Sequence, residues 1–182
     1  RQQFGYINRK GEWQIPPRFN TLLNFSDAGV APACEDKLYG LIDTQGKWVL
    51  QPKYASICEF NKDGLAFFDE INSWDNGHGY VNAKGNVVIK SGRHLSNAMI
   101  KGIARAEYTG SQYLTITGAK LSEVYFSWGE HFSQFGVAIA RTRDRDAGNL
   151  PSNRWGLINA NGSFNLLSDT LQEPLTDTNG WI

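Results

Sequence analysis

Residues 39–54 read YGLIDTQGKWVLQPKY, and this stretch decides the fold. Its first five residues are apolar or β-prone, which predicts a strand. TQG at 44–46 predicts a turn, with Gly46 suited to a positive φ, and KWVL at 47–50 predicts the returning strand of a hairpin. We expect Pro52 to end the pairing, because proline cannot donate to a β-ladder.

The opening of this stretch recurs along the chain. GLIDTQG from residue 40 is matched by GYINRKG from 5, GYVNAKG from 79 and GLINANG from 156, and a decayed copy, QYLTITG, ends at 118. A second pattern follows, as FSDAGVA, FNKDGLA, AMIKGIA and FSQFGVA. The turn glycine of the first pattern and the glycine of the second lie 17 or 18 residues apart, and Gly180 extends this spacing to a fifth copy.

The distance from the second pattern to the next copy varies from 10 to 20 residues. A constant spacing predicts a packed unit, and a variable one predicts loops that emerge on one side of an array. We therefore expect an all-β, single repeat domain over residues 1–182, with about five small antiparallel β-meanders. The approximate repeats are 4–37, 38–78, 79–111, 112–154 and 155–182.

Neighbouring repeats must stack, because one unit of this size cannot bury both of its faces. Trp13, Trp48 and Phe164 each follow a turn glycine by two residues, and we expect them to pack in the core or between units. The units could form an open, solenoid-like array or a propeller-like ring closed by a strand from Gly180. The decayed fourth copy breaks the symmetry and favours the open array.

Composition excludes several function classes. Eighteen Lys plus Arg balance eighteen Asp plus Glu, which argues against a nucleic-acid partner. No apolar run approaches the roughly 18 residues of a spanning helix, so we expect no membrane insertion. Cys34 and Cys58 are too few for a disulfide framework or a cysteine-based zinc site, and we interpret them as buried thiols, with a single bridge as the alternative. The chain begins with Arg1 rather than Met, so we expect a processed or excised product.

The stretch at 39–54, together with FNKDGLA at 60–66, resembles the WG repeat (also called KWG repeat) of bacterial proteins. Trp155 and Gly156 carry the dipeptide that names this family. The resemblance covers essentially the whole chain, although copy three lacks the Trp and the Pro and copy four keeps little besides its glycine spacing. It implies a β-repeat architecture, a bacterial binding or scaffolding role and no shared catalytic residue. A periplasmic or cell-surface location is favoured over a cytoplasmic one.

No combination of residues predicts catalysis, a metal or a cofactor. His78, His94 and His131 lie in different repeats without the spacing of metal ligands. His131 follows Glu130, but adjacent residues on a strand point to opposite faces, so the two make a poor acid–base pair. We expect a protein that is not an enzyme.

The variable loops carry the most promising functional residues. ARTRDRDAGNLPSNR at 140–154 has four Arg against two Asp, which suits a carboxylate or an acidic protein. DEINSWDNGH at 69–78 places a tryptophan among polar residues, as an interface anchor would be. A solvated loop with internal Arg–Asp pairs, or local packing of the tryptophan, remains the alternative. The candidate binding residues are Trp74, His78, Arg141, Arg143, Arg145 and Arg154.

We therefore expect a non-catalytic protein-binding or scaffolding module that uses these loops. One alternative is an envelope or surface module that binds glycan or peptidoglycan, with Trp13 and Trp48 stacked on sugars. Another is a toxin-neutralising (immunity) protein, which is a special case of protein binding.

Overall fold

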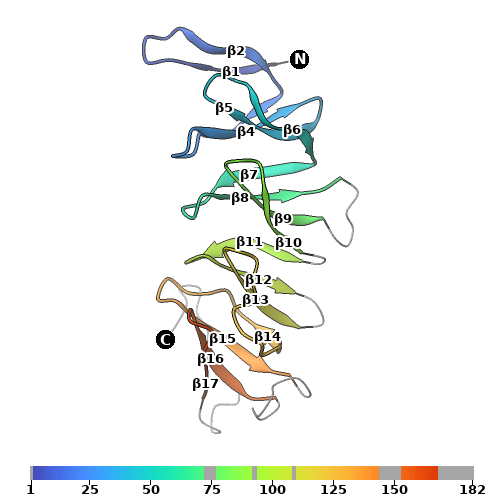
Figure 1. Cartoon of the computed structure of the whole chain (residues 1–182), viewed down its shortest axis with the longest axis vertical. Coiled ribbons are helices and arrows are strands. Elements are labelled where there is room, and N and C mark those ends of the chain that lie inside the picture. Colours follow the sequence, from blue (N-terminus) through green and yellow to red (C-terminus); the bar gives the residue numbers. More distant parts are fainter. Residues whose placement is uncertain (1, 72–76, 92–93, 108–109, 144–152, 168–182) are drawn as a thin grey trace. The chain divides into compact units, whose positions relative to one another are not determined.

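The computed structural model describes residues 2–71, 77–91, 94–107, 110–143 and 153–167. These residues form seventeen β-strands, and no helix occurs among them (Figure 1). The all-β fold that the sequence predicts is therefore confirmed. Within the same residues, no helix has the length and apolar character needed to span a membrane.

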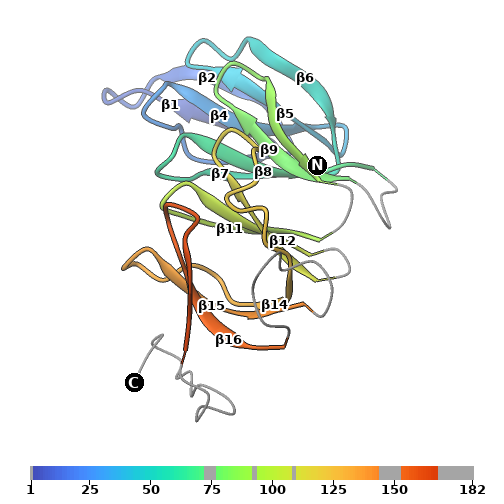
Figure 2. The same cartoon turned by 60° about the horizontal axis from the view of Figure 1, so that its bottom comes forward.

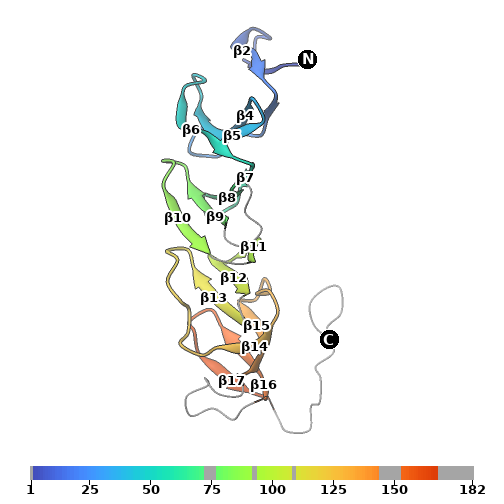
Figure 3. The same ribbon diagram turned by 90° about the vertical axis from the view of Figure 1, so that its right-hand side faces the viewer.

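The chain divides into two compact units, residues 1–92 and residues 93–182. The first unit holds three antiparallel sheets (Figure 3). The N-terminal sheet pairs β1 (Phe4–Ile7) with β2 (Trp13–Phe19). The second has the order β3-β4-β5-β6, with strands Thr21–Leu22, Val30–Glu35, Leu38–Asp43 and Trp48–Tyr54. The third has the order β10-β9-β8-β7, where β7 to β10 span Ser56–Phe60, Leu65–Asp69, His78–Asn82 and Val87–Ser91.

Each four-stranded sheet combines halves of two neighbouring sequence copies. β3 and β4 surround the second pattern of the first copy, whereas β5 and β6 are the opening hairpin of the second copy. One residue, Ala55, separates β6 from β7, so the chain passes directly from the edge of one sheet into the next. The predicted antiparallel meander is thus four-stranded here and straddles the border between copies.

The prediction that Pro52 ends the pairing is wrong. β6 continues to Tyr54, which pairs with Tyr39 of β5. β6 is an edge strand of its sheet. A proline is tolerated there because its missing N–H does not interrupt the hydrogen bonds of an inner strand. Irregular register between Tyr39 and Leu41 accommodates the proline.

The predicted hairpin turn is confirmed at residues 43–47. Gly46 has a φ of 77°, and its amide donates to the carbonyl of Asp43 at 2.9 Å. The Asp43 carboxylate accepts from the amides of Gln45 and Lys47, both at 2.9 Å. The Asn or Asp that opens each turn is therefore a side-chain cap as well as a turn former.

The glycine that opens each hairpin is required for a different reason, namely the close approach of the returning strand. A Cβ on Gly40 would lie 2.4 Å from the carbonyl oxygen of Leu50 on the returning strand. Gly79 has the same relation to Ile89, also at 2.4 Å. Two backbones approach closely here, so the space excludes a side chain.

Two hydrophobic clusters form the core of the first unit. One joins β2, β4 and β5 through Ile15, Phe19, Ala31, Ala33 and Ile42. The other joins β4 to β9 through Val30, Leu41, Tyr54, Ile57, Ala66, Phe68 and Val81. Because each cluster draws residues from more than one sheet, neighbouring copies in this unit share their core.

The three predicted core aromatics do not behave alike. Trp48 packs edge-on against Phe19 of the preceding copy, with ring centroids 5.5 Å apart. Phe164 packs against Phe126 at 5.1 Å. Trp13, however, is 57% exposed, so the prediction is wrong for this residue.

The second unit contains a seven-stranded antiparallel sheet in chain order, from β11 to β17 (Figure 2). Its strands span Leu95–Ile100, Ile103–Glu107, Ser111–Thr115, Phe126–Gly129, Val137–Thr142, Trp155–Asn159 and Phe164–Leu166. The decayed fourth copy keeps its turn glycine, Gly118, at a φ of 81° but lacks a returning strand. As a result, β14 pairs with both β13 and β15 and joins strands that lie in separate sheets in the first unit.

None of the sheets closes on itself within the described residues. Gly180, whose strand the ring alternative requires, lies outside them. Both cysteines are free thiols. Cys34 is buried as predicted, but Cys58 is exposed, so the interpretation of two buried thiols is wrong for Cys58.

Candidate functional site

The structure places the predicted binding residues at strand ends in both units. His78 begins β9 in the first unit, whereas Arg141 lies in β15 of the second. Arg143 follows β15 and Arg154 precedes β16. The remaining two predicted residues, Trp74 and Arg145, lie outside the described residues.

His78 belongs to a polar group centred on a carboxylate. Its Nδ1 lies 2.6 Å from Oδ1 of Asp69, and Ser56 Oγ donates to Oδ2 of the same carboxylate at 2.6 Å. The imidazole stacks on Phe67, with ring centroids 5.8 Å apart. Because the carboxylate lies between the imidazole and the hydroxyl, the histidine cannot take the serine proton as a general base would. The group orients His78 and ties together the ends of β7, β8 and β9.

Arg141 lies between two tryptophans on three neighbouring strands. It pairs with Trp128 of β14 on one side and with Trp155 of β16 on the other. Directly opposed residues of antiparallel strands point to the same face, so the three side chains form a row. We call Trp128, Arg141 and Trp155 the Trp–Arg–Trp row.

Aromatic and cation–π contacts hold this row together. The two indole rings meet edge to face, with centroids 5.3 Å apart and an interplanar angle of 74°. The Arg141 guanidinium carbon lies 5.6 Å from the Trp155 ring centroid. Trp128 is 38% exposed, whereas Arg141 and Trp155 are partly buried. The row therefore presents the Trp128 indole to solvent, beside a partly buried cation.

The backbone beneath the row is tied at both ends. Ser127 Oγ donates to the carbonyls of Arg141 and Thr142, at 3.2 and 3.3 Å. The Thr142 amide donates to the Arg154 carbonyl at 2.9 Å, and the Arg154 amide donates to Thr142 Oγ1 at 3.0 Å. These bonds keep the ends of β14, β15 and β16 in register around Arg141.

The same register position carries different chemistry in each copy. In each copy, one strand residue lies five places after the glycine of the second pattern. It pairs with the residue just before the glycine that opens the next hairpin, or before Gln112, which replaces that glycine in the decayed copy. These pairs are Cys34 with Tyr39, Asp69 with His78, Glu107 with Ser111, and Arg141 with Trp155. Each of these pairs borders a variable loop, and its two residue types differ from copy to copy.

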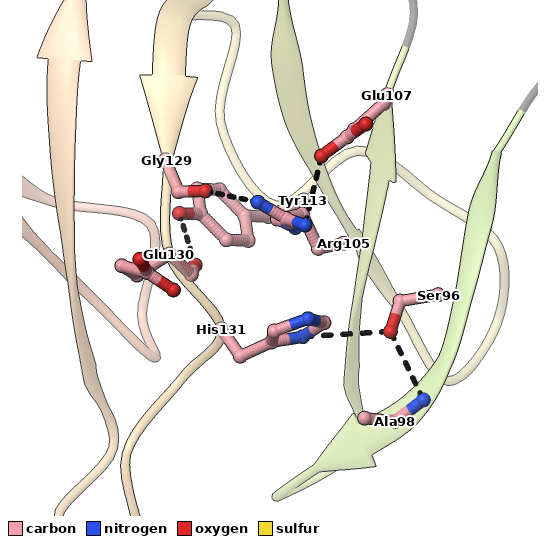
Figure 4. A network of polar contacts seen from close by, with 8 residues as sticks. All are labelled: Ser96, Ala98, Arg105, Glu107, Tyr113, Gly129, Glu130 and His131. Atoms are coloured by element: carbon pink, nitrogen blue, oxygen red, sulfur yellow. Dashed lines mark hydrogen bonds and ion pairs between the residues drawn. The ribbon is translucent and has the colours of Figure 1, made fainter. Parts of the chain in front are cut away.

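A polar network lies on the neighbouring strands of the second unit (Figure 4). Arg105 donates to the Gly129 carbonyl and forms a 2.8 Å ion pair with Glu107. The Tyr113 hydroxyl donates to the Glu130 carbonyl at 2.6 Å. These contacts fix β14, and with it Trp128, to β12 and β13.

His131 and Glu130 do not form an acid–base pair. In Figure 4 the imidazole extends toward Ser96, whose Oγ lies 3.4 Å from Nδ1, while the Glu130 side chain points away from it. Burial lowers the pKa of His131, and the positive charge of Arg105 lowers it further. Both effects favour the neutral form of the imidazole.

Two hollows accompany these groups. One of about 580 Å³ in the first unit lies between Asn24–Ala28 and Glu59–Gly64. Its lining includes Phe25 and Phe60 together with the carboxylates of Asp27, Glu59 and Asp63. The second, of about 230 Å³, is lined by Glu107, Gly110, Ser111, Ser127 and Trp128. Trp128 thus borders both this hollow and the Trp–Arg–Trp row. Among the described residues, no three His, Cys, Asp or Glu side chains are grouped to hold a metal ion.

Sequence reasoning identified Arg141 but missed the two tryptophans beside it. In the sequence, Trp155 stands out only through its dipeptide with Gly156, and Trp128 lies in the decayed copy. The signal was present in the spacing. Trp128 lies eight residues before Gly136, as Ser56 lies eight residues before Gly64 in the second copy. Ser56 pairs with Asp69, and Asp69 is the counterpart of Arg141, so the second copy predicts the pairing of Trp128 with Arg141.

One of three comparisons with known proteins, the match to a family model, agrees with the repeat architecture. The family model of the WG containing repeat matches residues 4–39 and 39–74. A search of curated proteins finds no match. Among solved structures, a crystal structure of a eukaryotic initiation factor is 11% identical with a TM-score of 0.49 over 90% of this chain. The chain spans 48% of that protein's length. On this match, the first two copies, residues 4–74, belong to the WG repeat family.

Proposed function

We propose that this chain is a non-catalytic protein-binding module that contacts its partner through the Trp–Arg–Trp row. The observation that carries the proposal is an arginine whose neighbours on the two adjacent strands are tryptophans, with its guanidinium over the ring of Trp155. Trp and Arg are the residue types most enriched among the hot spots of protein interfaces. A rigid, partly exposed cluster of this kind offers a large contact area at a small cost in side-chain entropy.

A glycan-binding module is the second candidate, because Trp13 and Trp128 both present indole surface to solvent. The geometry of the row favours a protein over a glycan. Sugar rings stack on flat aromatic faces, whereas the planes of Trp128 and Trp155 meet at 74° and Arg141 covers one face of Trp155.

Affinity capture from a bacterial lysate tests the proposal. The intact chain, Trp128→Ala and Trp13→Ala are each used as bait, and recovered proteins are identified by mass spectrometry. Trp13→Ala is the matched control, because it removes an exposed indole that lies outside the row. We expect a protein that is recovered with the intact chain and with Trp13→Ala, and whose affinity for Trp128→Ala is roughly tenfold lower or worse.

Equal recovery with both variants would contradict the proposed surface, and recovery of no protein would contradict the proposed function. Thermal unfolding of the variants checks that each bait is folded. Binding of soluble oligosaccharides that depends on Trp13 or Trp128 would instead support the glycan candidate. Such binding is measured by calorimetry with the same three proteins.

A further inference from the structure

We propose that Arg141 is a receptor for a single carboxylate, supplied by the partner as a chain terminus or as an Asp or Glu side chain. This inference rests on the proposed protein-binding function and names the chemistry that the Trp–Arg–Trp row recognises. It begins with the hydrogen-bonding state of the guanidinium. The Nε of Arg141 is buried and has no hydrogen-bond partner among the described residues.

Two other arginines have acceptors within the protein, although Arg18 is exposed and the Nε of Arg105, like that of Arg141, has no partner among the described residues. Arg18 donates to the Gly46 carbonyl at 2.6 Å and lies over the ring of Phe19. Arg105 donates to the Gly129 carbonyl and pairs with Glu107 at 2.8 Å. No carboxylate in the described part of the chain pairs with Arg141, which contacts only the Trp155 ring and the backbone of its neighbours. A buried donor without an acceptor is unfavourable, and an incoming anion removes that penalty.

The guanidinium is also held in place before any ligand arrives. It lies over the ring of Trp155, which itself packs against Trp128, and the Ser127 hydroxyl donates to the backbone carbonyl of Arg141. A planar guanidinium donates two parallel hydrogen bonds to a carboxylate. Partial exclusion of water by the indoles strengthens such a pair.

A carboxylate fits this site better than a phosphate. Glu107 lines the hollow that Trp128 borders, so a dianion beside the row meets a repulsion, which the ion pair of Glu107 with Arg105 weakens. A monoanionic carboxylate meets less of this repulsion. The residue next to the ligand's carboxylate would enter the hollow of about 230 Å³. Its lining of Ser111, Ser127 and Glu107 offers acceptors, which favours a side chain that donates hydrogen bonds there.

The test uses three peptides of equal length and the indole N–H signals of the full chain in NMR spectra. One peptide has a free C-terminal carboxylate and no acidic side chain, the second is its C-terminal amide, and the third is that amide with one Asp. We expect at least one carboxylate peptide to shift the Trp128 and Trp155 signals. The plain amide should bind at least tenfold more weakly, and the Trp13 signal should stay in place with every peptide. The carboxylate peptide that binds identifies the source, and inorganic phosphate should compete poorly.

Arg141→Gln should reduce binding of the carboxylate peptide to the level of the amide. Arg9→Gln removes the same charge from an exposed turn residue and should change nothing. Because Arg141 has no side-chain acceptor in the part of the chain that the structure describes, Arg141→Gln should unfold at the same temperature as the intact chain or higher. A lower unfolding temperature, equal binding of amide and carboxylate, or no effect of Arg141→Gln on binding would overturn the carboxylate site.

The two proposals fail in different ways. A protein partner that is lost with Trp128→Ala, together with peptides that ignore Arg141→Gln, would overturn the carboxylate site alone. A carboxylate peptide that binds through Arg141, with no protein recovered from lysate, would overturn the protein-binding function alone.

Discussion

Gly40 and Gly46 lie in the same hairpin, yet different physical demands select them. Gly46 adopts a φ of 77°, a conformation that L-residues with a Cβ rarely take. Gly40 has no positive φ, but the carbonyl oxygen of Leu50 occupies the space of its missing Cβ. The glycine of the dipeptide that names this family is thus a close-approach glycine rather than a turn glycine.

This distinction predicts unequal effects of alanine. Gly40→Ala forces the backbones of β5 and β6 apart and should lower the free energy of unfolding by roughly 2–3 kcal/mol. Gly64→Ala meets no atom within 4 Å, so it should cost only the roughly 1–2 kcal/mol of its positive φ. Urea unfolding of both variants measures the difference. Equal midpoints would contradict the close-approach explanation.

His131 should make stability depend on pH. Its pKa is lowered below 6.5 in the folded chain, so the unfolded chain binds the proton at a higher pH. The free energy of unfolding should therefore fall as the pH drops through 6.5 and level off below the folded pKa. Glu130 and Glu107 oppose this shift, and burial and Arg105 outweigh them.

The check on His131 is chemical unfolding between pH 7.5 and 5 with the intact chain and His131→Gln. The variant should lose the part of the pH dependence that centres just below 6.5. An identical dependence in the two proteins would assign the effect to other groups.

At the scale of elements, local features were predictable and partner choice was not. The hairpin turn at Asp43–Lys47 depends on neighbouring residues and follows from the sequence. The pairing of β4 with β5 joins two different copies, and only the fold reveals it. Pro52 remains in a strand because β6 is an edge strand, a fact of sheet order rather than of local sequence.

The candidate site follows the same division. The arginine-rich loop predicted that Arg141 faces a partner, but the tryptophans beside it come from β14 and β16. Thirteen residues separate Trp128 from Arg141 along the chain, and register alone brings them together. The decayed copy obscured this register, since its returning strand is absent.

The decayed copy predicts uneven protection of backbone amides. β6 pairs along residues 48–54, whereas residues 119–125 make one bridge, Leu114 to Lys120, and two backbone bonds, from the Thr115 amide to the Ala119 carbonyl and from the Leu121 amide to the Tyr113 carbonyl. The Val124 amide donates only to the nearby Ser122 hydroxyl. Amides of residues 122–125 should exchange with solvent far faster than those of β6 that donate to β5. Hydrogen exchange resolved by NMR measures this. Comparable protection would indicate a returning strand that the structure lacks.

At the scale of the whole molecule, each compact unit carries its own hydrophobic clusters. A unit with its own core should fold without the other. Residues 1–92 expressed alone should show a β-type circular dichroism spectrum and a cooperative unfolding transition. A fragment that lacks a transition would show that the core of the first unit needs the rest of the chain.

The most direct test of the account is the footprint of the captured protein on this chain. Hydrogen exchange of the chain, alone and with its partner, locates the contact surface without any substitution. We predict slower exchange in β14, β15 and β16, around Trp128, Arg141 and Trp155, and no change in the β1–β2 hairpin. Protection confined to the hairpin around Trp13, with none in those three strands, would contradict the assignment of the Trp–Arg–Trp row as the binding surface.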